Sequence, residues 1–269
     1  MTTLTHSVDA DASFSEYDPP GAVNRVPEVT PSFWLIKLMA VTMGETAADF
    51  LAVNLGLGLT ATSLLMAAIL SGALVLQFGQ KRYVPWSYWL AVVLISIVGT
   101  LVTDNLVDNL GVSLVTTTVF FTLALAATFA LWWAFFNDTA TTEIYTTRRE
   151  AFYWLAILFT FALGTAAGDL VAEQFGLGYL ATGILFGMII ASITAGYYGL
   201  GLDGILAFWI AYIFTRPLGA SFGDLLSQPA DYGGLGLGTI MTSAIFLSVI
   251  VATVVWMTVS NRSRNAPSA

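Results

Sequence analysis

The sequence predicts an all-α membrane protein with eight transmembrane helices, and composition, hydropathy and an internal repeat support this fold class. Of the 269 residues, 57% are hydrophobic and only 10% are charged, whereas soluble domains carry about 25% charged residues. The mean hydropathy of +0.80 agrees with a chain that has little water-facing surface. The apolar stretches reach about 20 residues, enough to cross the hydrocarbon core as helices, and the alternating pattern of a membrane barrel is absent.

The first 30 residues precede these stretches and predict a disordered, acidic cytoplasmic tail. The segment carries five carboxylates and several prolines, and it has little apolar surface to bury. It has neither a basic start nor an apolar run, so we do not interpret it as a signal peptide. The chain has no cysteine, and its only histidine, His6, lies in this tail. These two facts exclude disulfides, His/Cys zinc sites and histidine-dependent catalysis.

Four segments of the chain share one pattern, in which a glycine is followed five residues later by an aspartate. The segments are GETAAD (Gly44–Asp49), GTLVTD (Gly99–Asp104), GTAAGD (Gly164–Asp169) and GASFGD (Gly219–Asp224). A tryptophan stands ten residues before each glycine, at Trp34, Trp89, Trp154 and Trp209. In three copies a second glycine follows the first after twelve residues, at Gly56, Gly111 and Gly176, whereas the fourth copy carries the insertion SQPADYGG. The chain is therefore built from four tandem repeats.

Each repeat contains two apolar runs, which predict eight helices. Their ranges are 33–54, 59–78, 86–108, 113–135, 151–173, 177–198, 204–226 and 237–259. Because each repeat crosses the membrane twice, all four should be parallel and related by a pseudo-symmetry axis along the membrane normal. The predicted segments are the tail (1–30), repeat 1 (31–80), repeat 2 (81–136), a cytoplasmic linker (137–150), repeat 3 (151–200), repeat 4 (201–260) and a C-terminal cytoplasmic tail (261–269).

The basic residues predict the orientation of these helices. They gather on the side of the two termini, whereas the loops on the other side contain no Lys or Arg. The basic residues in question are Arg25, Lys81, Arg82, Arg148, Arg149, Arg262 and Arg264. Because cytoplasmic loops are enriched in Lys and Arg, we expect a multi-pass protein of the bacterial inner membrane with both termini in the cytoplasm.

The repeat pattern resembles a family of bacterial membrane proteins that contain four tandem copies of a repeat of unknown function. The resemblance rests on GETAAD, GTAAGDL, TRPLGASFGD and the four tryptophans, and it covers about residues 30–260. It implies repeats of two membrane spans with a tryptophan, but no established activity. It also implies a histidine-containing stretch just before Arg148, where this chain has Asn137–Thr146, NDTATTEIYT. These ten residues match the in-frame translation of a widely used sequencing-adapter oligonucleotide, and we interpret them as a sequence artefact.

Seven carboxylates lie inside or at the ends of the predicted spans and form the candidate cation or proton path. They are Glu45, Asp49, Asp104, Asp108, Asp169, Glu173 and Asp224. A charged side chain near the bilayer centre costs about 2.5–3.5 kcal/mol on insertion scales, so these groups should face the interior, reach the interface, pair or stay protonated. Glu45 lies nearest the midplane. The four repeat aspartates lie in the outer third, where a solvated helix end is the alternative.

Lys37 and Arg216 are the only cations within the predicted spans and are candidate internal counter-charges. Lys37 either snorkels to the cytoplasmic face or stays inside, and Arg216 should pair with an interior carboxylate. The tryptophans fit an interfacial belt better than a ligand-stacking role. The repeat glycines favour close helix packing, with a broken helix as the alternative, above all next to Pro217.

The intramembrane carboxylates favour a transporter or channel for a small cation. A metal bound here would have oxygen ligands, which suits Mg, Ca or Mn, and protons are an equal candidate because clustered carboxylates titrate as a coupled set. One alternative is a helical scaffold that transports nothing. Another is an intramembrane aspartyl protease, but its G-x-G-D motif fails because AAGD and SFGD lack the first glycine. We expect membrane lipids and a small cation as partners, no nucleic acid and no cofactor, and the oligomeric state is left open.

Overall fold

The computed structural model describes residues 23–264, and within this range the chain forms eight α-helices and no strand. Each predicted helix overlaps an observed helix over most of its length. Most of the predicted N-terminal tail, including His6, and the end of the C-terminal tail lie outside the described residues.

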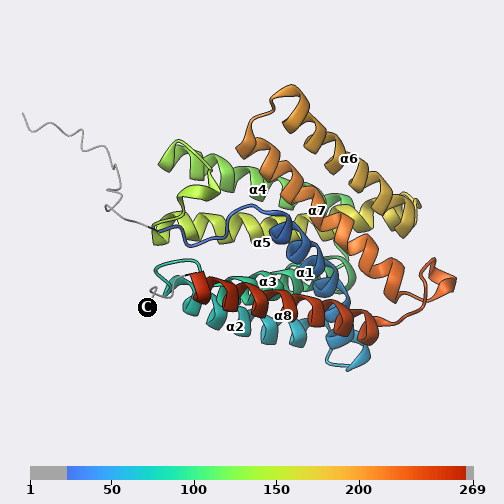
Figure 1. Cartoon of the computed structure of the whole chain (residues 1–269). Helices are drawn as coiled ribbons and strands as arrows, with labels where there is room; N and C mark the ends of the chain where they lie inside the picture. The colour runs from blue at the N-terminus through green and yellow to red at the C-terminus, as the bar shows by residue number, and fades with distance from the viewer. Residues whose placement is uncertain (1–22, 265–269) are drawn as a thin grey trace, which may run out of the picture.

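Four helices, one from each repeat, form a closed inner ring. They are α1 (Pro31–Asp49), α3 (Pro85–Asp104), α5 (Thr147–Asp169) and α7 (Gly204–Ser227). Around the ring, α1 contacts α3, α3 contacts α5, α5 contacts α7, and α7 contacts α1. In Figure 1 these four helices lie between α4 and α6 on one side and α2 and α8 on the other. The glycine, aspartate and tryptophan of every repeat are therefore carried by the inner ring.

The other four helices surround the ring. They are α2 (Leu59–Phe78), α4 (Leu114–Phe136), α6 (Tyr179–Leu200) and α8 (Thr239–Arg264). Each packs against the inner helix of the following repeat, so that α2 covers α3, α4 covers α5 and α6 covers α7. The last outer helix, α8, packs against α1 and joins the end of the chain to its beginning.

The outer surface has the character of a surface that faces lipid. Seven of the described helices are long and apolar enough to cross a membrane, and α1 is the exception. Only 17–22% of the residues in the apolar windows of α2, α4, α6 and α8 are buried within the protein, against 61–67% in α3, α5 and α7. Large apolar side chains such as Leu64, Val75 and Leu123 are exposed on the outer helices. Because so much apolar surface would be unfavourable in water, we conclude that this is a multi-pass membrane protein.

Three of the four inner helices, α1, α5 and α7, begin with a capping side chain. The hydroxyl of Thr30 accepts a hydrogen bond from the backbone N–H of Phe33 at 3.2 Å, and α1 starts at Pro31. Thr146 caps α5 and Asp203 caps α7 in the same way. A side-chain oxygen at this position satisfies one of the free N–H groups of the first turn.

Three inner helices end in a π-helical turn directly after the repeat aspartate. The turns are Phe50–Asn54, Asn105–Asn109 and Leu170–Gln174. The second glycine of each repeat follows, with φ of +68° at Gly56, +67° at Gly111 and +70° at Gly176. Glycine adopts this left-handed conformation at little cost, which explains why it recurs at this spacing. In contrast, α7 runs without a break through Pro217 to Ser227, so the broken helix considered from the sequence is not present.

The segment before α1 is packed against the loops at the start of the inner helices. The backbone N–H of Tyr83 donates to the carbonyl of Asn24 at 3.0 Å, and the N–H of Arg25 donates to the carbonyl of Ile144 at 3.1 Å. Val26 is buried beside them. Residues 24–26, at the end of the predicted tail, are thus part of the folded structure.

Linker residues 137–146 lie at the same end of the molecule. Asp138 and Glu143 each pair with Arg149, at 3.2 and 3.3 Å. These contacts follow from the residues present and leave the interpretation of the segment as a sequence artefact a prediction.

Candidate ion site inside the helix ring

The repeat glycines mark the closest contacts between neighbouring inner helices. Each glycine packs against the residue that stands three positions before the glycine of the next repeat. The pairs are Gly44 with Ser96, Gly99 with Phe161, Gly164 with Arg216, and Gly219 with Val41. In every pair a methyl group on the glycine would overlap the side chain opposite. The glycines therefore allow the inner helices to approach closely, as small residues do in membrane proteins.

The residues that follow these glycines form a buried ion-pair cluster with Arg216. Nη2 of Arg216 lies 2.9 Å from Oε2 of Glu45. The hydroxyl of Thr100 donates to the same carboxylate oxygen at 3.1 Å. Nη2 also donates to the hydroxyl of Thr165 at 2.7 Å and to that of Thr100. The side chains of Arg216 and Glu45 are 0% and 7% exposed, so protein encloses the ion pair almost completely.

The two members of this ion pair differ in what they can do chemically. A guanidinium keeps its charge in proteins, whereas a carboxylate can bind a proton and become neutral. Arg216 is held by oxygen atoms on one side, and its Cζ lies 5.5 Å from the centre of the Phe161 ring on another. Its Nε and Nη1 atoms are buried without a hydrogen-bond partner. Glu45 is therefore the member of the pair whose charge can change.

The four repeat aspartates lie one helical turn beyond Glu45 and its equivalents. Asp224 is buried, whereas Asp49, Asp104 and Asp169 are half-buried. Each of Asp104, Asp169 and Asp224 interacts electrostatically with both Glu45 and Asp49. The structure thus brings the aspartates of all four repeats together near the ion pair.

The remaining two predicted carboxylates lie further out. Asp108 and Glu173 are exposed on π-helical turns. The hydroxyl of Tyr179 donates to Glu173 at 3.3 Å. Among the described residues, no three acidic or histidine side chains are arranged so that they could hold a metal ion. The carboxylates are neighbours, but in this conformation they do not form a metal-binding cage.

Lys37 points into the protein and does not snorkel to the cytoplasmic face. Its side chain is 0% exposed. Its Nζ donates to the backbone carbonyl of Tyr212 at 2.8 Å and lies 3.9 Å from the centre of the Tyr212 ring. Within the described range, no carboxylate lies within ion-pair distance of Lys37. It is a buried amine beside an aromatic ring, and it does not take part in the Glu45–Arg216 ion pair.

The repeat tryptophans do not form the predicted interfacial belt. Trp89, Trp154 and Trp209 are only 1%, 3% and 4% exposed, and the interpretation is therefore wrong for these three. The indole N–H of Trp89 donates to the hydroxyl of Tyr83 at 3.2 Å, and that of Trp154 donates to Glu150 at 3.2 Å. The outer helices cover the inner ring. A tryptophan near the end of an inner helix therefore packs against protein and is shielded from lipid.

A further buried carboxylate, Glu150, has no recognisable signature in the sequence. Its side chain is 0% exposed and accepts hydrogen bonds from Arg25 at 2.9 Å and from Gln77 at 3.0 Å, in addition to Trp154. In the sequence Glu150 follows two arginines at the start of a helix, where a solvated residue is expected. Its partner Gln77 ends an outer helix, and no repeat spacing connects the two positions.

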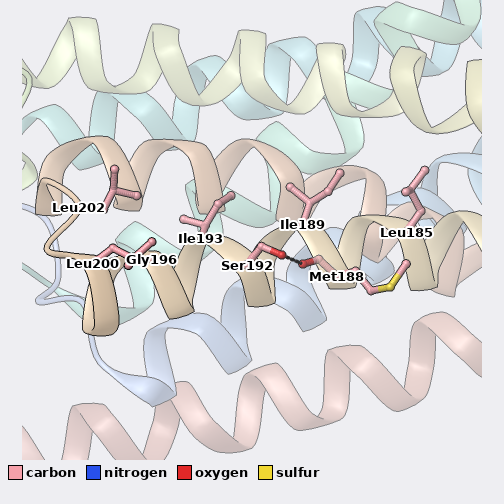
Figure 2. Close-up of a pocket in the computed structure, with 8 residues that line it drawn as sticks. All are labelled: Leu185, Met188, Ile189, Ser192, Ile193, Gly196, Leu200 and Leu202. Atoms are coloured by element: carbon pink, nitrogen blue, oxygen red, sulfur yellow. Dashed lines mark hydrogen bonds between the residues drawn. The ribbon is translucent and has the colours of Figure 1, made fainter.

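Two grooves open on the outside of the molecule, and neither contains the ion pair. Figure 2 shows the first, about 510 Å³ in volume, which runs along α6 and is lined almost entirely by apolar side chains. Its one drawn hydrogen bond joins the hydroxyl of Ser192 to the backbone carbonyl of Met188, within the helix. The second groove, about 730 Å³, lies between α1, α6, α7 and the linker and is also mainly apolar. Neither groove is a continuation of the candidate ion site.

Comparison with known proteins identifies the repeat. No curated protein and no solved structure matches the chain. The profile of the family described as Repeat of Unknown Function (DUF347) matches four times, at residues 32–83, 87–136, 152–201 and 207–263. These ranges correspond to the four predicted repeats and together cover most of the chain. The chain therefore belongs to this family of tandem repeats of unknown function.

Proposed function

We propose that this protein moves a small cation across the membrane, and that the proton is the cation favoured by the geometry. The observation that carries the proposal is Glu45, an acidic side chain enclosed by the helix ring and paired with Arg216 at 2.9 Å. Ionisable groups inside membrane spans are expensive to bury and commonly serve ion or proton pathways. The four half-buried or buried aspartates next to this pair supply the acidic approach to it.

The proton is favoured over a divalent metal because of the charge beside Glu45. A metal ion at Glu45 would meet the permanent positive charge of Arg216 a few ångströms away, at a short range where repulsion is strong. A proton instead binds to the carboxylate itself, removes its charge and weakens the ion pair. Arg216 then keeps its hydrogen bonds to the hydroxyls of Thr100 and Thr165. Protonation of Glu45 is thus a local change that can loosen the contact between α1 and α7.

The same proposal includes the symmetry and orientation of the helices. The cyclic glycine contacts and the closed inner ring support four parallel repeats around an axis along the membrane normal, with eight spans in all. The basic loops before α3 and α5 support cytoplasmic termini in a bacterial inner membrane. In this orientation the four aspartates lie toward the outside, and Lys37 and Glu150 lie toward the cytoplasm.

Topology reporters provide a direct check of this orientation. Fusions at residues 81, 148 and 262 should report the cytoplasm, and fusions at 57, 112 and 231 should report the outside, because every repeat crosses the membrane twice. An external signal at residue 148 would require an odd number of spans before that point. It would therefore contradict the parallel arrangement of the repeats.

Proton flux into liposomes tests the function. Purified protein should carry protons down an imposed gradient, measured with a pH-sensitive dye inside the vesicles. Asp169→Asn should reduce this flux by about tenfold or more and leave the protein folded, because it removes one charge from a like-charged group. The double variant Glu45→Gln/Arg216→Met should reduce flux by about a hundredfold, the usual scale for loss of a positioned proton-transfer group. The double variant removes both charges together and so avoids an unpaired buried ion.

The controls separate the proposal from its alternatives. Empty liposomes and liposomes with heat-treated protein give the background, and thermal unfolding in detergent reports whether each variant is folded. The wild-type protein could instead carry Mn²⁺ or Mg²⁺ and no protons. If both Asp169→Asn and the double variant abolished that metal flux, the transported cation would be a divalent metal. A folded protein that carries neither protons nor metal ions would favour the scaffold, for which the close glycine contacts are the supporting observation. A folded double variant with wild-type flux would overturn the role of Glu45.

A further inference from the structure

One aromatic ring lies close to both Arg216 and Lys37, the two cations that are buried among the described residues. The centre of the Phe161 ring lies 5.5 Å from Cζ of Arg216 and 5.8 Å from Nζ of Lys37. Phe161 is 0% exposed, and its Cβ packs against Gly99 of the neighbouring helix. Four residues along each helix advance the chain by about one turn, so Lys37 lies two turns from Glu45 on α1. The Phe161 ring is thus adjacent to both the Glu45–Arg216 pair and Lys37.

Lys37 has the chemistry of a group that can exchange a proton at this place. A lysine amine can be neutral or charged when it is buried, whereas a guanidinium remains charged. The Nζ of Lys37 donates to the backbone carbonyl of Tyr212 and lies over the rings of Tyr212 and Phe161, all of which can accommodate an ammonium without neutralising it. A structural cation would be expected to have a carboxylate partner, as Arg216 does.

The titratable groups that face Lys37 come from α7. They are Arg216 and Tyr212, and Tyr88 on α3 and Tyr153 on α5 lie beyond Tyr212. The helix α8, which also packs against α1, has no titratable side chain between Thr239 and Ser260. The members of this set beyond Lys37 are tyrosines, and the carboxylate of Glu150 lies beyond Tyr153.

These tyrosines continue from Lys37 toward the end of the bundle. The hydroxyl of Tyr212 is buried without a hydrogen-bond partner. Tyr88 and Tyr153 lie near it, and their hydroxyls share a hydrogen bond of 2.5 Å. Tyr83 lies next, with its ring 5.7 Å from that of Tyr88, and it is half-buried in the loop before α3. Phenol groups both donate and accept hydrogen bonds, so they can relay a proton.

We propose that Lys37 and Tyr212 form a second proton-binding station on the cytoplasmic side of Phe161, and that Phe161 is the barrier between this station and Glu45. The inference rests on the proposed function and extends the proton path from Glu45 to the cytoplasmic side. When the Phe161 ring moves aside, the proton of the Glu45 carboxylic acid passes to the neutral amine of Lys37. The carboxylate returns to Arg216, and the ammonium releases the proton through the tyrosine hydroxyls toward the cytoplasm. No oxidant or second substrate is needed.

Two Lys37 variants distinguish proton exchange from a structural role. Lys37→Arg keeps a positive charge and a donor for the Tyr212 carbonyl, but its guanidinium does not release protons. Lys37→Met removes the charge and the donor and keeps a flexible chain. In the same liposome assay, both should reduce proton flux by about a hundredfold, with Lys37→Arg close to the wild-type unfolding temperature. Wild-type flux from Lys37→Arg would show that only the charge or the donor matters and would overturn the proposal.

The barrier has its own test, which does not depend on the Lys37 variants. Phe161→Ala should raise the passive proton leak by several-fold, because the ring no longer separates the two stations. Phe121→Ala is the matched control, since Phe121 is a buried phenylalanine, 3% exposed, on the outer helix α4. An equal proton leak from Phe161→Ala and Phe121→Ala would overturn the proposal. This test remains valid even if Lys37→Arg fails to fold.

The outcome for the proposed function is read separately. Absence of flux from the wild-type protein, or wild-type flux from the folded Glu45→Gln/Arg216→Met variant, would refute that function and with it this inference. If that double variant loses proton flux while Lys37→Arg keeps wild-type flux, the role of Glu45 in transport is retained and only the second proton-binding station is refuted.

Discussion

Replacement of Glu45 by glutamine alone should lower the free energy of unfolding by about 3–5 kcal/mol, the scale measured when one partner of a buried ion pair is removed. The variant leaves Arg216 buried at 0% exposure without a counter-charge. Arg216→Met should be less harmful, because the remaining carboxylate can become neutral by binding a proton. The double variant should approach the stability of Arg216→Met or exceed it. The order of stability among these variants is measured by the unfolding temperature and by the fraction of protein that stays soluble in detergent after heating.

The opposite order would contradict the role given to the pair. If Arg216→Met were more destabilising than Glu45→Gln, the guanidinium would serve mainly as a packing element against Phe161 and Gly164. Additive effects of the two single changes would show that the two side chains do not interact energetically. Glu45→Ala is less suitable for this comparison, because it also leaves a cavity.

Gly164→Ala should be the second disruptive change, with a loss of about 1–3 kcal/mol in stability, as is usual for overpacking. The added methyl would overlap Cβ and Cγ of Arg216, and it would also lie 3.0 Å from Cδ of Pro217. These atoms are near the backbone of α7 and cannot rotate away, so α5 and α7 must separate. Arg216 would then move relative to Glu45, and proton flux should fall together with stability.

The matched control is Gly72→Ala on the outer helix α2. A Cβ at Gly72 meets no atom within 4 Å, and alanine has the higher helix propensity by about 1 kcal/mol. The unfolding temperature of this control should therefore be unchanged or higher. An equal loss of stability in Gly72→Ala and Gly164→Ala would contradict the importance of the glycine contacts.

The helices and the repeat were predictable because each has a local signature. The apolar runs set the helix positions, and the glycine–aspartate spacing revealed the four repeats before any contact was known. Counting from Trp34 predicts that Glu45 lies nearest the bilayer midplane, and this depth stays a prediction; in the structure Glu45 is buried near the end of α1. Arg216 was recognised as too deep to be solvated, and the structure shows it paired with Glu45.

The features that the sequence did not reveal depend on contacts between distant segments. The tryptophans were assigned to the lipid interface because sequence position gives depth but not the covering helix. Lys37 could reach either water or the interior, and its carbonyl partner on α7 lies 175 residues away in sequence. Glu150 has one partner a single helical turn away, Trp154, but its other two, Arg25 and Gln77, lie on different segments with no recognisable spacing to it. The π-helical turns were also unexpected, because only their terminal glycine leaves a mark in the sequence.

The contact of α8 with α1 has a consequence for the way the protein enters the membrane. Among the described helices α1 is the one that is not apolar enough to span by itself, and it carries Lys37, Glu45 and Asp49. Its neighbours α3, α7 and α8 all follow it in the chain, and α8 is made last. Of these helices, α1 is thus the least able to stay in lipid alone, and it is made before the helices that cover it. We expect its stable insertion to wait for these later helices, so that this bundle is complete only when α8 packs against α1.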